Sequence, residues 1–174
     1  KGFGFPIFQV EGVEADDVIA TIVEKTSHSM KDITDIIVTG DMDTLQLIDA
    51  RTSVNSMRKG VNDIVKYDAQ AVKERYGLTP EQMVDYKALR GDVSDNIKGV
   101  PGIGEKTAVE LLQKFDTLEN VYQAVEKNSE VVKKTVAEKL LAHKKEAFQS
   151  KELVILKRDV VLDFNLEACK VGEP

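Results

Sequence analysis

The first half of the chain alternates short apolar, β-branched runs with stretches in which apolar residues recur at helical spacing. The most apolar of these runs, residues 35–39, ends at Gly40 and predicts a buried parallel strand. Strands that alternate with helices are typical of an α/β fold. The elements expected in this half are strands at residues 7–10, 35–39, 52–57 and 64–67, a loop at 59–62 between the last two, and helices at residues 13–27 and 41–48.

The second half of the chain is mostly helical. Thr79 is a predicted N-cap, and Gln82 three residues later can complete a capping box. Gly91 ends the helix that follows. We therefore predict an α/β core over residues 1–90 and a helical region over residues 91–174. The elements expected in the second half are helices at residues 68–76, 79–90, 105–114, 117–127, 129–142 and 143–150, and a last extended piece at 160–164.

Composition narrows the class of protein. The chain has 174 residues, of which 42% are hydrophobic, and this is enough to bury a core. It contains no apolar run of about 18 residues, so no membrane span is expected. The single cysteine, Cys169, cannot form an internal disulfide, which indicates a reducing, cytoplasmic location. The chain begins at Lys1 rather than Met, which we interpret as a fragment boundary.

Charge is distributed unevenly along the sequence. The net charge of −6 argues by itself against binding of nucleic acid. Residues 1–95, however, carry 11 Lys or Arg against 17 Asp or Glu, whereas residues 96–151 carry 10 against 8. The excess of negative charge therefore lies in the α/β half, where bound cations would offset it.

Three short acidic segments flank the predicted elements. Asp41 and Asp43 follow the most apolar strand, and open α/β sheets place their sites at the carboxyl ends of strands. Each segment taken alone is also explained by helix capping or by a polar turn. Oxygen-only groups select hard cations such as Mg²⁺ or Mn²⁺, and two His and one Cys leave few ligands for zinc. The predicted ligands are Glu14, Asp16, Asp17, Asp41, Asp43, Asp92 and Asp95, the last two aligned by one helical turn.

A glycine-rich segment at residues 99–107 predicts a tight turn followed by a helix. It is not a P-loop, because Glu105 follows Gly104 where lysine is required. Gly102 and Gly104 allow positive φ, and the N–H groups at the start of the next helix can bind a phosphate. An ordinary turn between packed helices is the alternative. The residues predicted to contact a DNA backbone are Lys98, Gly102, Ile103, Gly104, Lys106 and Thr107.

Together these segments resemble the bacterial 5′-nuclease family, the flap-endonuclease-like 5′→3′ exonucleases found at the N-terminus of DNA polymerase I. The resemblance covers roughly residues 7–164. It implies a PIN-like α/β core, incomplete at its N-terminus, followed by a helix-hairpin-helix region of the helix-three-turn-helix type. Four motifs occur in the family's order: Glu14-Ala15-Asp16-Asp17, Thr39-Gly40-Asp41-Met42-Asp43, Gly91-Asp92-Val93-Ser94-Asp95-Asn96 and Val100-Pro101-Gly102-Ile103-Gly104-Glu105-Lys106-Thr107-Ala108.

The resemblance also implies a function, namely two-metal hydrolysis of DNA or RNA-primer phosphodiesters at 5′ flaps, nicks or primer ends during replication and repair. Glu14, Asp16 and Asp17 would belong to the first metal cluster, and the other four acids to the second. The implied cofactors are two Mg²⁺ or Mn²⁺ ions and a K⁺ at the hairpin. The implied partners are DNA and a linked polymerase domain, and the chain is expected to be a monomer. Family members also have a strand with a metal-binding Asp, a second Asp and a helical arch, which we do not find before Lys1.

Two other functions remain open at this point. In a haloacid-dehalogenase-like phosphatase, Asp41 would be the nucleophile and Asp43 the general acid, with Asp92 and Asp95 as Mg²⁺ ligands. That assignment leaves the glycine hairpin and the Glu14 segment unexplained. The chain could instead be a DNA-binding fragment without catalytic activity, which keeps the hairpin and lacks part of the metal site.

Overall fold

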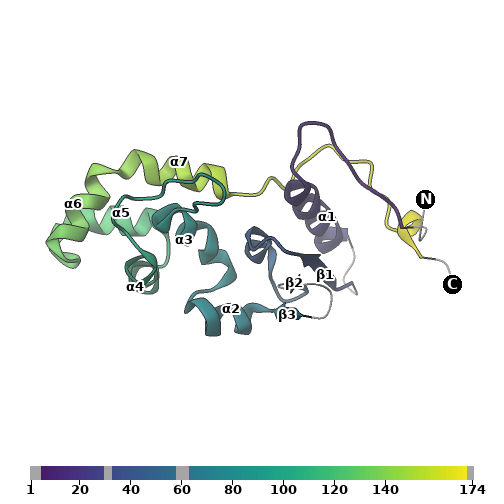
Figure 1. The fold of residues 1–174 in the computed structure, drawn as a ribbon, viewed down its shortest axis with the longest axis horizontal. Coiled ribbons are helices and arrows are strands. Elements are labelled where there is room, and N and C mark those ends of the chain that lie inside the picture. Colours follow the sequence, from purple (N-terminus) through teal and green to yellow (C-terminus); the bar gives the residue numbers. More distant parts are fainter. Residues whose placement is uncertain (1–4, 30–32, 58–62, 172–174) are drawn as a thin grey trace.

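A computed structural model describes residues 5–29, 33–57 and 63–171, in which a small sheet adjoins a larger group of helices (Figure 1). The sheet has the strand order β1 (Asp35–Thr39), β2 (Thr52–Met57) and β3 (Ile64–Tyr67). Strand β1 pairs parallel with β2, and β2 pairs antiparallel with β3. Helix α1 (Ala15–Ser29) packs on this sheet, and the 3₁₀-helix η1 (Asp43–Leu47) follows β1. The predicted α/β character is confirmed, and the loop predicted at 59–62 lies outside the described residues.

Strand β1 is buried on one face, whereas the sequence predicted a fully buried strand. Ile37 lies in the core with 6% of its surface exposed, but Ile36 and Val38 are 60% and 55% exposed. Side chains alternate between the two faces of a strand, so full burial needs cover on both faces. Among the described residues only the face of Ile37 packs into the core.

Two segments predicted as extended form no strand. Residues 7–10 and 160–164 are irregular, because among the described residues neither has a strand beside it to complete its backbone hydrogen bonds. They contact each other instead, with the rings of Phe8 and Phe164 centred 5.7 Å apart. Figure 1 shows the first and last parts of the chain running near each other beyond α1. The strand predicted at residues 7–10 is therefore wrong.

The helices predicted for the second half are present, except that the single helix predicted at residues 129–142 is wrong, because Val132 has extended backbone angles and separates a short 3₁₀-helix at 129–131 from a helix at 134–142. Helix α3 packs against α4 and α7, and the apolar faces of these helices join the core of the sheet in one continuous cluster. The predicted capping contact forms at Thr79, whose N–H donates to the side chain of Gln82 at 3.1 Å. Within the described ranges, no helix is long and apolar enough to cross a membrane. The elements are α2 (Ala69–Tyr76), η2 (Pro80–Gln82), α3 (Met83–Arg90), α4 (Glu105–Phe115), α5 (Leu118–Lys127), η3 (Ser129–Val131), α6 (Lys134–Ala142), α7 (Lys144–Val154) and η4 (Glu167–Cys169).

An ion-pair cluster around the buried carboxylate of Asp85 links three of these helices. The ammonium group of Lys151 on α7 lies 2.7 Å from Asp85 Oδ1 on α3 and 2.8 Å from Glu119 Oε1 on α5. The other oxygen of Asp85 accepts a hydrogen bond from the backbone N–H of Leu118 at 2.9 Å. Both ends of the pair are therefore satisfied, which a buried charge requires.

A buried amide connects the sheet to the helices. Gln46 of η1 donates from Nε2 to the carbonyl of Val154 at 3.0 Å and accepts at Oε1 from the N–H of Leu156 at 3.1 Å. These backbone groups lie at the end of α7, where the chain leaves the helices and crosses towards α1 (Figure 1). Because η1 begins at Asp43, the same amide also fixes the acidic end of β1 relative to α7.

Substituting Gln46 with alanine is expected to lower the free energy of unfolding by about 2–4 kcal/mol, since it leaves two buried backbone groups without a partner. The measurement is urea unfolding followed by circular dichroism. Gln70→Ala is the matched control, because the exposed amide of Gln70 donates to Glu74 on the same helix. The control is expected to change stability by less than about 0.5 kcal/mol. Equal losses in both variants would show that the amide of Gln46 is not a structural connection.

Candidate functional site

The end of β1 presents two acids at one edge of the sheet. The N–H of Asp41 donates to Thr39 Oγ1 at 3.0 Å, and Asp41 Oδ1 accepts from the N–H of Asp43 at 2.9 Å. Asp43 then begins η1, and its side chain is 15% exposed. These two acids therefore lie where the strand pattern predicted them, with Asp41 exposed and Asp43 directed towards the helices.

The start of α1 brings a second group of acids to the same place. Burial and the nearby charges of Asp41, Glu14 and Asp17 raise the pKa of Asp16, and a hydrogen bond with Asp41 adds to this effect. Asp17 differs from its neighbours, because its Oδ1 accepts the backbone N–H of Lys157 at 2.9 Å. One oxygen of Asp17 is thus used to hold the segment after α7. The raised pKa of Asp16 indicates that negative charge accumulates here.

The third group lies in the loop after α3. The N–H of Asp92 donates to the carbonyl of Ile97 at 2.9 Å, and the N–H of Ile97 donates back to Asp92 at 2.7 Å. Asn96 has a φ of 56°, which lets the chain reverse. The predicted helical turn is wrong, because this pair of hydrogen bonds closes a tight antiparallel loop instead. The loop nevertheless brings the carboxylates of Asp92 and Asp95 to one side.

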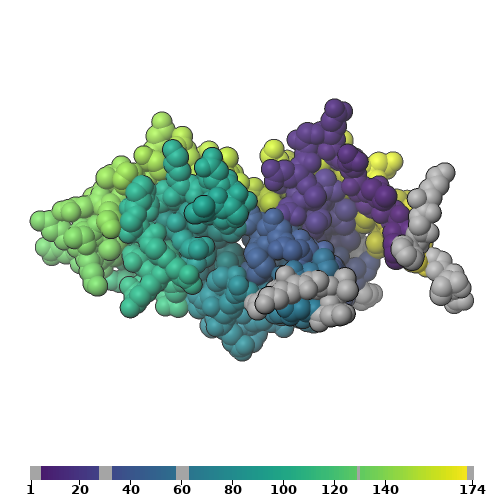
Figure 2. All heavy atoms as spheres, viewed as in Figure 1, coloured from purple at the N-terminus to yellow at the C-terminus, as the bar shows by residue number. Residues whose placement is uncertain are grey.

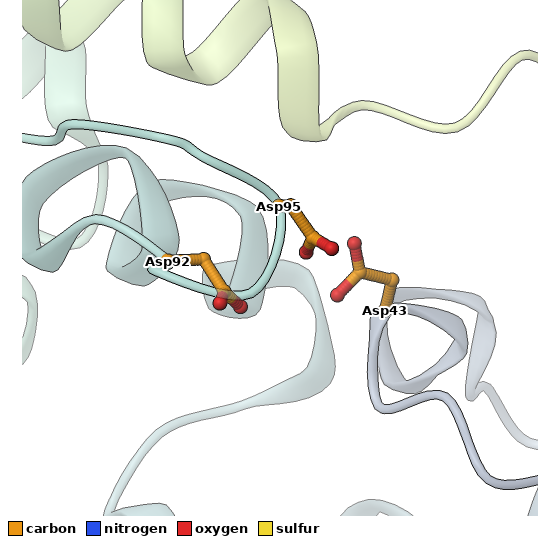
Figure 3. Close-up of side chains that lie close together, drawn as sticks. All are labelled: Asp43, Asp92 and Asp95. Carbon is orange, nitrogen blue, oxygen red and sulfur yellow. The ribbon is translucent and has the colours of Figure 1, made fainter.

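Asp43, Asp92 and Asp95 form a compact group (Figure 3). One carboxylate oxygen from each residue lies within 4.8 Å of the others. In Figure 3 the carboxylate of Asp95 points towards that of Asp43, so the loop after α3 faces the end of β1. Three carboxylates from two distant segments, with ligand atoms this close, fit the all-oxygen coordination that hard divalent cations prefer.

A lysine reaches into this group. Lys87 Nζ lies 2.8 Å from Asp92 Oδ2 and 3.7 Å from Asp95 Oδ2, and it is ion-paired with Asp43. The side chain of Lys87 is 11% exposed. Burial opposes ionisation of Asp92, but hydrogen bonds from Lys87 and Ser94 outweigh it and lower the pKa of Asp92 to about 2. The group is therefore held together by a protein cation.

The acids border two adjoining cavities. The larger, of about 480 Å³, lies where α1, the end of β1 and the end of α7 meet. Figure 2 shows a notch between the purple surface of the first residues and the teal surface of the helical part. The smaller, of about 370 Å³, adds Asp92 together with Lys87. Asp41 and Asp95 line both cavities. The predicted acids that line the larger cavity are Glu14, Asp16, Asp17, Asp41, Asp43 and Asp95.

The sequence reasoning missed several charged residues that line these cavities, and two of them lie beside the acids. Lys87 is one, and no local pattern marks it, because its contact with Asp43 depends on how α3 packs beside the end of β1. Glu152 of α7 is the other, and it lines the larger cavity. No local pattern marks Glu152, because its position depends on how α7 ends against the sheet.

The glycine hairpin has the predicted turn with one difference. Gly102 has a φ of 80°, but Gly104 has a φ of −94° and needs no glycine on conformational grounds. The side chain of Ile103 is buried and its N–H donates to the carbonyl of Val100 at 3.0 Å, so Ile103 anchors the turn. Helix α4 then begins at Glu105.

Basic side chains surround this turn. Lys98 and Lys106 are exposed, and Thr107 is half-buried. The ammonium group of Lys139, from α6, donates to the carbonyl of Gly102 at 3.0 Å. No local sequence pattern places Lys139 at this turn, because its contact depends on the packing of α6. The hairpin is thus a positively charged surface next to the start of a helix.

Comparison with known proteins gives the family to which this chain belongs. A family model described as "5'-3' exonuclease, N-terminal resolvase-like domain" matches residues 1–77, and one described as "5'-3' exonuclease, C-terminal SAM fold" matches residues 78–174. The chain therefore belongs to the 5′-3′ exonuclease family. The family and the fold class predicted from the sequence are confirmed.

Individual relatives agree with this assignment. DNA polymerase I of Bacillus caldotenax is 41% identical over 167 residues, which are 96% of this chain and 18% of the relative. A structure of T5 5′-exonuclease with bound zinc is 28% identical with a TM-score of 0.75, covering 88% of this chain and 54% of that one. A bacteriophage T5 D15 flap endonuclease complex with DNA and metal ions is 27% identical, with a TM-score of 0.74 over 88% and 53%. The chain spans about a fifth of the curated relatives and about half of these solved structures.

Proposed function

We propose that this chain supplies most of the metal site and a DNA-binding hairpin of a divalent-metal-dependent 5′→3′ exonuclease and flap endonuclease. The observation that carries the proposal is the group formed by Asp43, Asp92 and Asp95, whose ligand oxygens lie within 4.8 Å of one another. It stands next to the acids of α1 in an open cavity. The T5 structures with divalent metal ions and DNA, which share this fold, support it.

The acids divide into two sets by position. The set at the end of β1 and in the loop after α3 would hold one Mg²⁺ or Mn²⁺ ion, and the set at the start of α1 would hold a second. When bound, such ions supply Lewis-acid stabilisation of the negative charge that develops in phosphodiester hydrolysis. The raised pKa of Asp16 supports a cation at the second set, since a nearby positive charge would relieve the repulsion from Asp41 and Glu14.

The hairpin would hold the duplex next to these acids. Exposed Lys98 and Lys106 and the N–H groups at the start of α4 are suited to phosphate contacts that do not read base sequence. The loop with Asp92 and Asp95 runs directly into this hairpin, so the metal site and the DNA contact are connected by a few residues. We propose that residues 1–90 carry most of the metal ligands and residues 91–174 hold DNA at a 5′ flap, nick or primer end, with a K⁺ at the hairpin. A polymerase domain in the same protein is a further proposal, which the polymerase I relatives support.

The test is cleavage of a 5′-labelled flap duplex by this chain, with Mg²⁺, with Mn²⁺ and with EDTA. Metal-dependent release of the flap supports the proposal. Salt-dependent DNA binding without cleavage would favour a DNA-binding fragment. Turnover of a small phosphomonoester without cleavage of DNA would favour the phosphatase alternative based on Asp41.

Lys106→Ala is expected to weaken binding to flap duplexes of unrelated sequence by a similar factor. The side chain of Lys106 is 91% exposed and would contact phosphate, so the slope of log affinity against log salt should fall by about 1. Fluorescence anisotropy at several salt concentrations measures both effects. Lys66→Ala, which removes an exposed lysine of β3, is the control with the same change of charge. A similar slope change in both variants would mean that net charge, and not the hairpin, determines binding.

A further inference from the structure

We propose that Lys87 is the built-in counter-cation of the group formed by Asp43, Asp92 and Asp95, and that a divalent ion binds this group by displacing the lysine's ammonium group. The inference rests on the proposed metal function of the group. According to this inference, Lys87 of α3 determines how tightly the group binds an ion.

The first argument is where the ammonium group lies. Its nitrogen is 2.8 Å from Asp92 and 3.7 Å from Asp95 and is paired with Asp43, so it contacts all three carboxylates. Their ligand atoms surround one point, because all of them lie within 4.8 Å of one another. An ion held by all three oxygens would need the space that the ammonium group fills.

The second argument is charge. Three carboxylates this close, two of them partly buried, repel one another unless a cation stands between them. Lys87 supplies one positive charge against three negative ones, so the group keeps an unbalanced negative charge that attracts an ion. A divalent ion beside an ammonium group that stayed in place would be repelled by it. Displacement avoids this repulsion.

The third argument is that the lysine has room to move. Its side chain lines the cavity of about 370 Å³ that adjoins the acidic group, together with Tyr86 and Arg90. A lysine carries its charge on a flexible four-carbon stem, so the ammonium group can move into this space while the backbone of α3 stays fixed.

The inference predicts that one substitution lowers the stability of the ion-free protein and raises its affinity for Mn²⁺. Lys87→Met keeps the length of the side chain and removes its charge. Without an ion, the three carboxylates of the variant then repel one another, so the variant is expected to unfold at lower urea concentration in EDTA than the wild type. With Mn²⁺, the ion no longer competes with an ammonium group, so its dissociation constant is expected to fall on the order of tenfold. If Lys87 only stabilises the packing of α3, its substitution would lower stability without tightening the binding of Mn²⁺.

Calorimetric titration with Mn²⁺ tests this on the wild type, on Lys87→Met and on the control Lys145→Met, which removes an exposed lysine of α7. Tighter binding in Lys87→Met alone supports the inference, and Asp95→Asn in the same background should abolish the gain if the ion binds this group. Equal or weaker binding by Lys87→Met overturns the inference but leaves the proposed metal site standing. Absence of Mn²⁺ binding in every form overturns both.

A second measurement uses the wild type and so does not depend on folding of the variant. Brief acetylation with acetic anhydride, followed by peptide mass spectrometry, reports how accessible each lysine is. Lys87 is expected to react slowly in EDTA and several-fold faster with saturating Mn²⁺, because the displaced ammonium group loses its carboxylate partners. Lys145 should react at the same rate in both conditions. An unchanged or lower rate at Lys87 with Mn²⁺ overturns the inference.

Discussion

Asp41→Asn in the intact nuclease is expected to reduce metal-dependent flap cleavage on the order of a hundredfold or more, while the fold and DNA binding remain. Asp41 lines both acidic cavities, and its charge contributes to the raised pKa of Asp16, so it acts on both groups of acids. The asparagine oxygen can still accept the N–H of Asp43, as Asp41 does at 2.9 Å, which preserves the local turn. The variant therefore removes charge and little else.

The measurement compares single-turnover cleavage of a flap duplex with its binding in Ca²⁺, where cleavage is not required. Asp63→Asn is the matched control, because Asp63 is an exposed acid next to β3. The control should cleave at the wild-type rate. Wild-type cleavage by Asp41→Asn would remove Asp41 from the site, and loss of DNA binding in parallel with cleavage would point to a disturbed fold instead of a lost charge.

The elements that depend on local sequence were predictable. The two strands over Thr52–Met57 and Ile64–Tyr67 have the predicted bounds, and α4 begins at the predicted residue after the glycine hairpin. Hydrophobic periodicity, caps and glycines determine such elements within a few residues of the chain. The acids at the end of β1 were predictable for the same reason, because a strand end is a local feature with a known place in an α/β sheet.

Features that depend on distant packing were not predictable. Residues 7–10 have the composition of a strand, but no strand in the described part of the chain lies beside them, and no local pattern indicates whether a partner strand is present. Lys87 reads as an ordinary helix lysine until α3 is placed beside the end of β1, which brings Asp43 into contact with it. The acidic group is therefore less negatively charged than the sequence suggested.

The shape of the loop with Asp92 and Asp95 depends on a contact between two glycine backbones. Gly91 has a φ of 82° and Gly99 a φ of 61°, both in the region that favours glycine. A Cβ added to Gly99 would lie 2.2 Å from the backbone nitrogen of Gly91 and 2.7 Å from the carbonyl carbon of Arg90. The loop thus begins and ends at a place where no side chain fits, and this closure holds its two carboxylates towards Asp43.

Gly99→Ala is expected to lower the free energy of unfolding by about 4 kcal/mol or more, because the added methyl group meets backbone atoms that cannot rotate away. The N–H of Gly99 also donates to the buried hydroxyl of Ser150 at 3.2 Å, so shifting the backbone to relieve the clash would break this contact with α7. Urea unfolding measures the loss. Gly104→Ala is the matched control, since a Cβ there meets nothing within 4 Å at a φ of −94°, and it should change stability by less than about 1 kcal/mol. Similar unfolding midpoints for the two variants would contradict the glycine contact. A loss confined to Gly99→Ala would show that the acidic loop and the adjacent glycine hairpin differ in their tolerance of an added side chain.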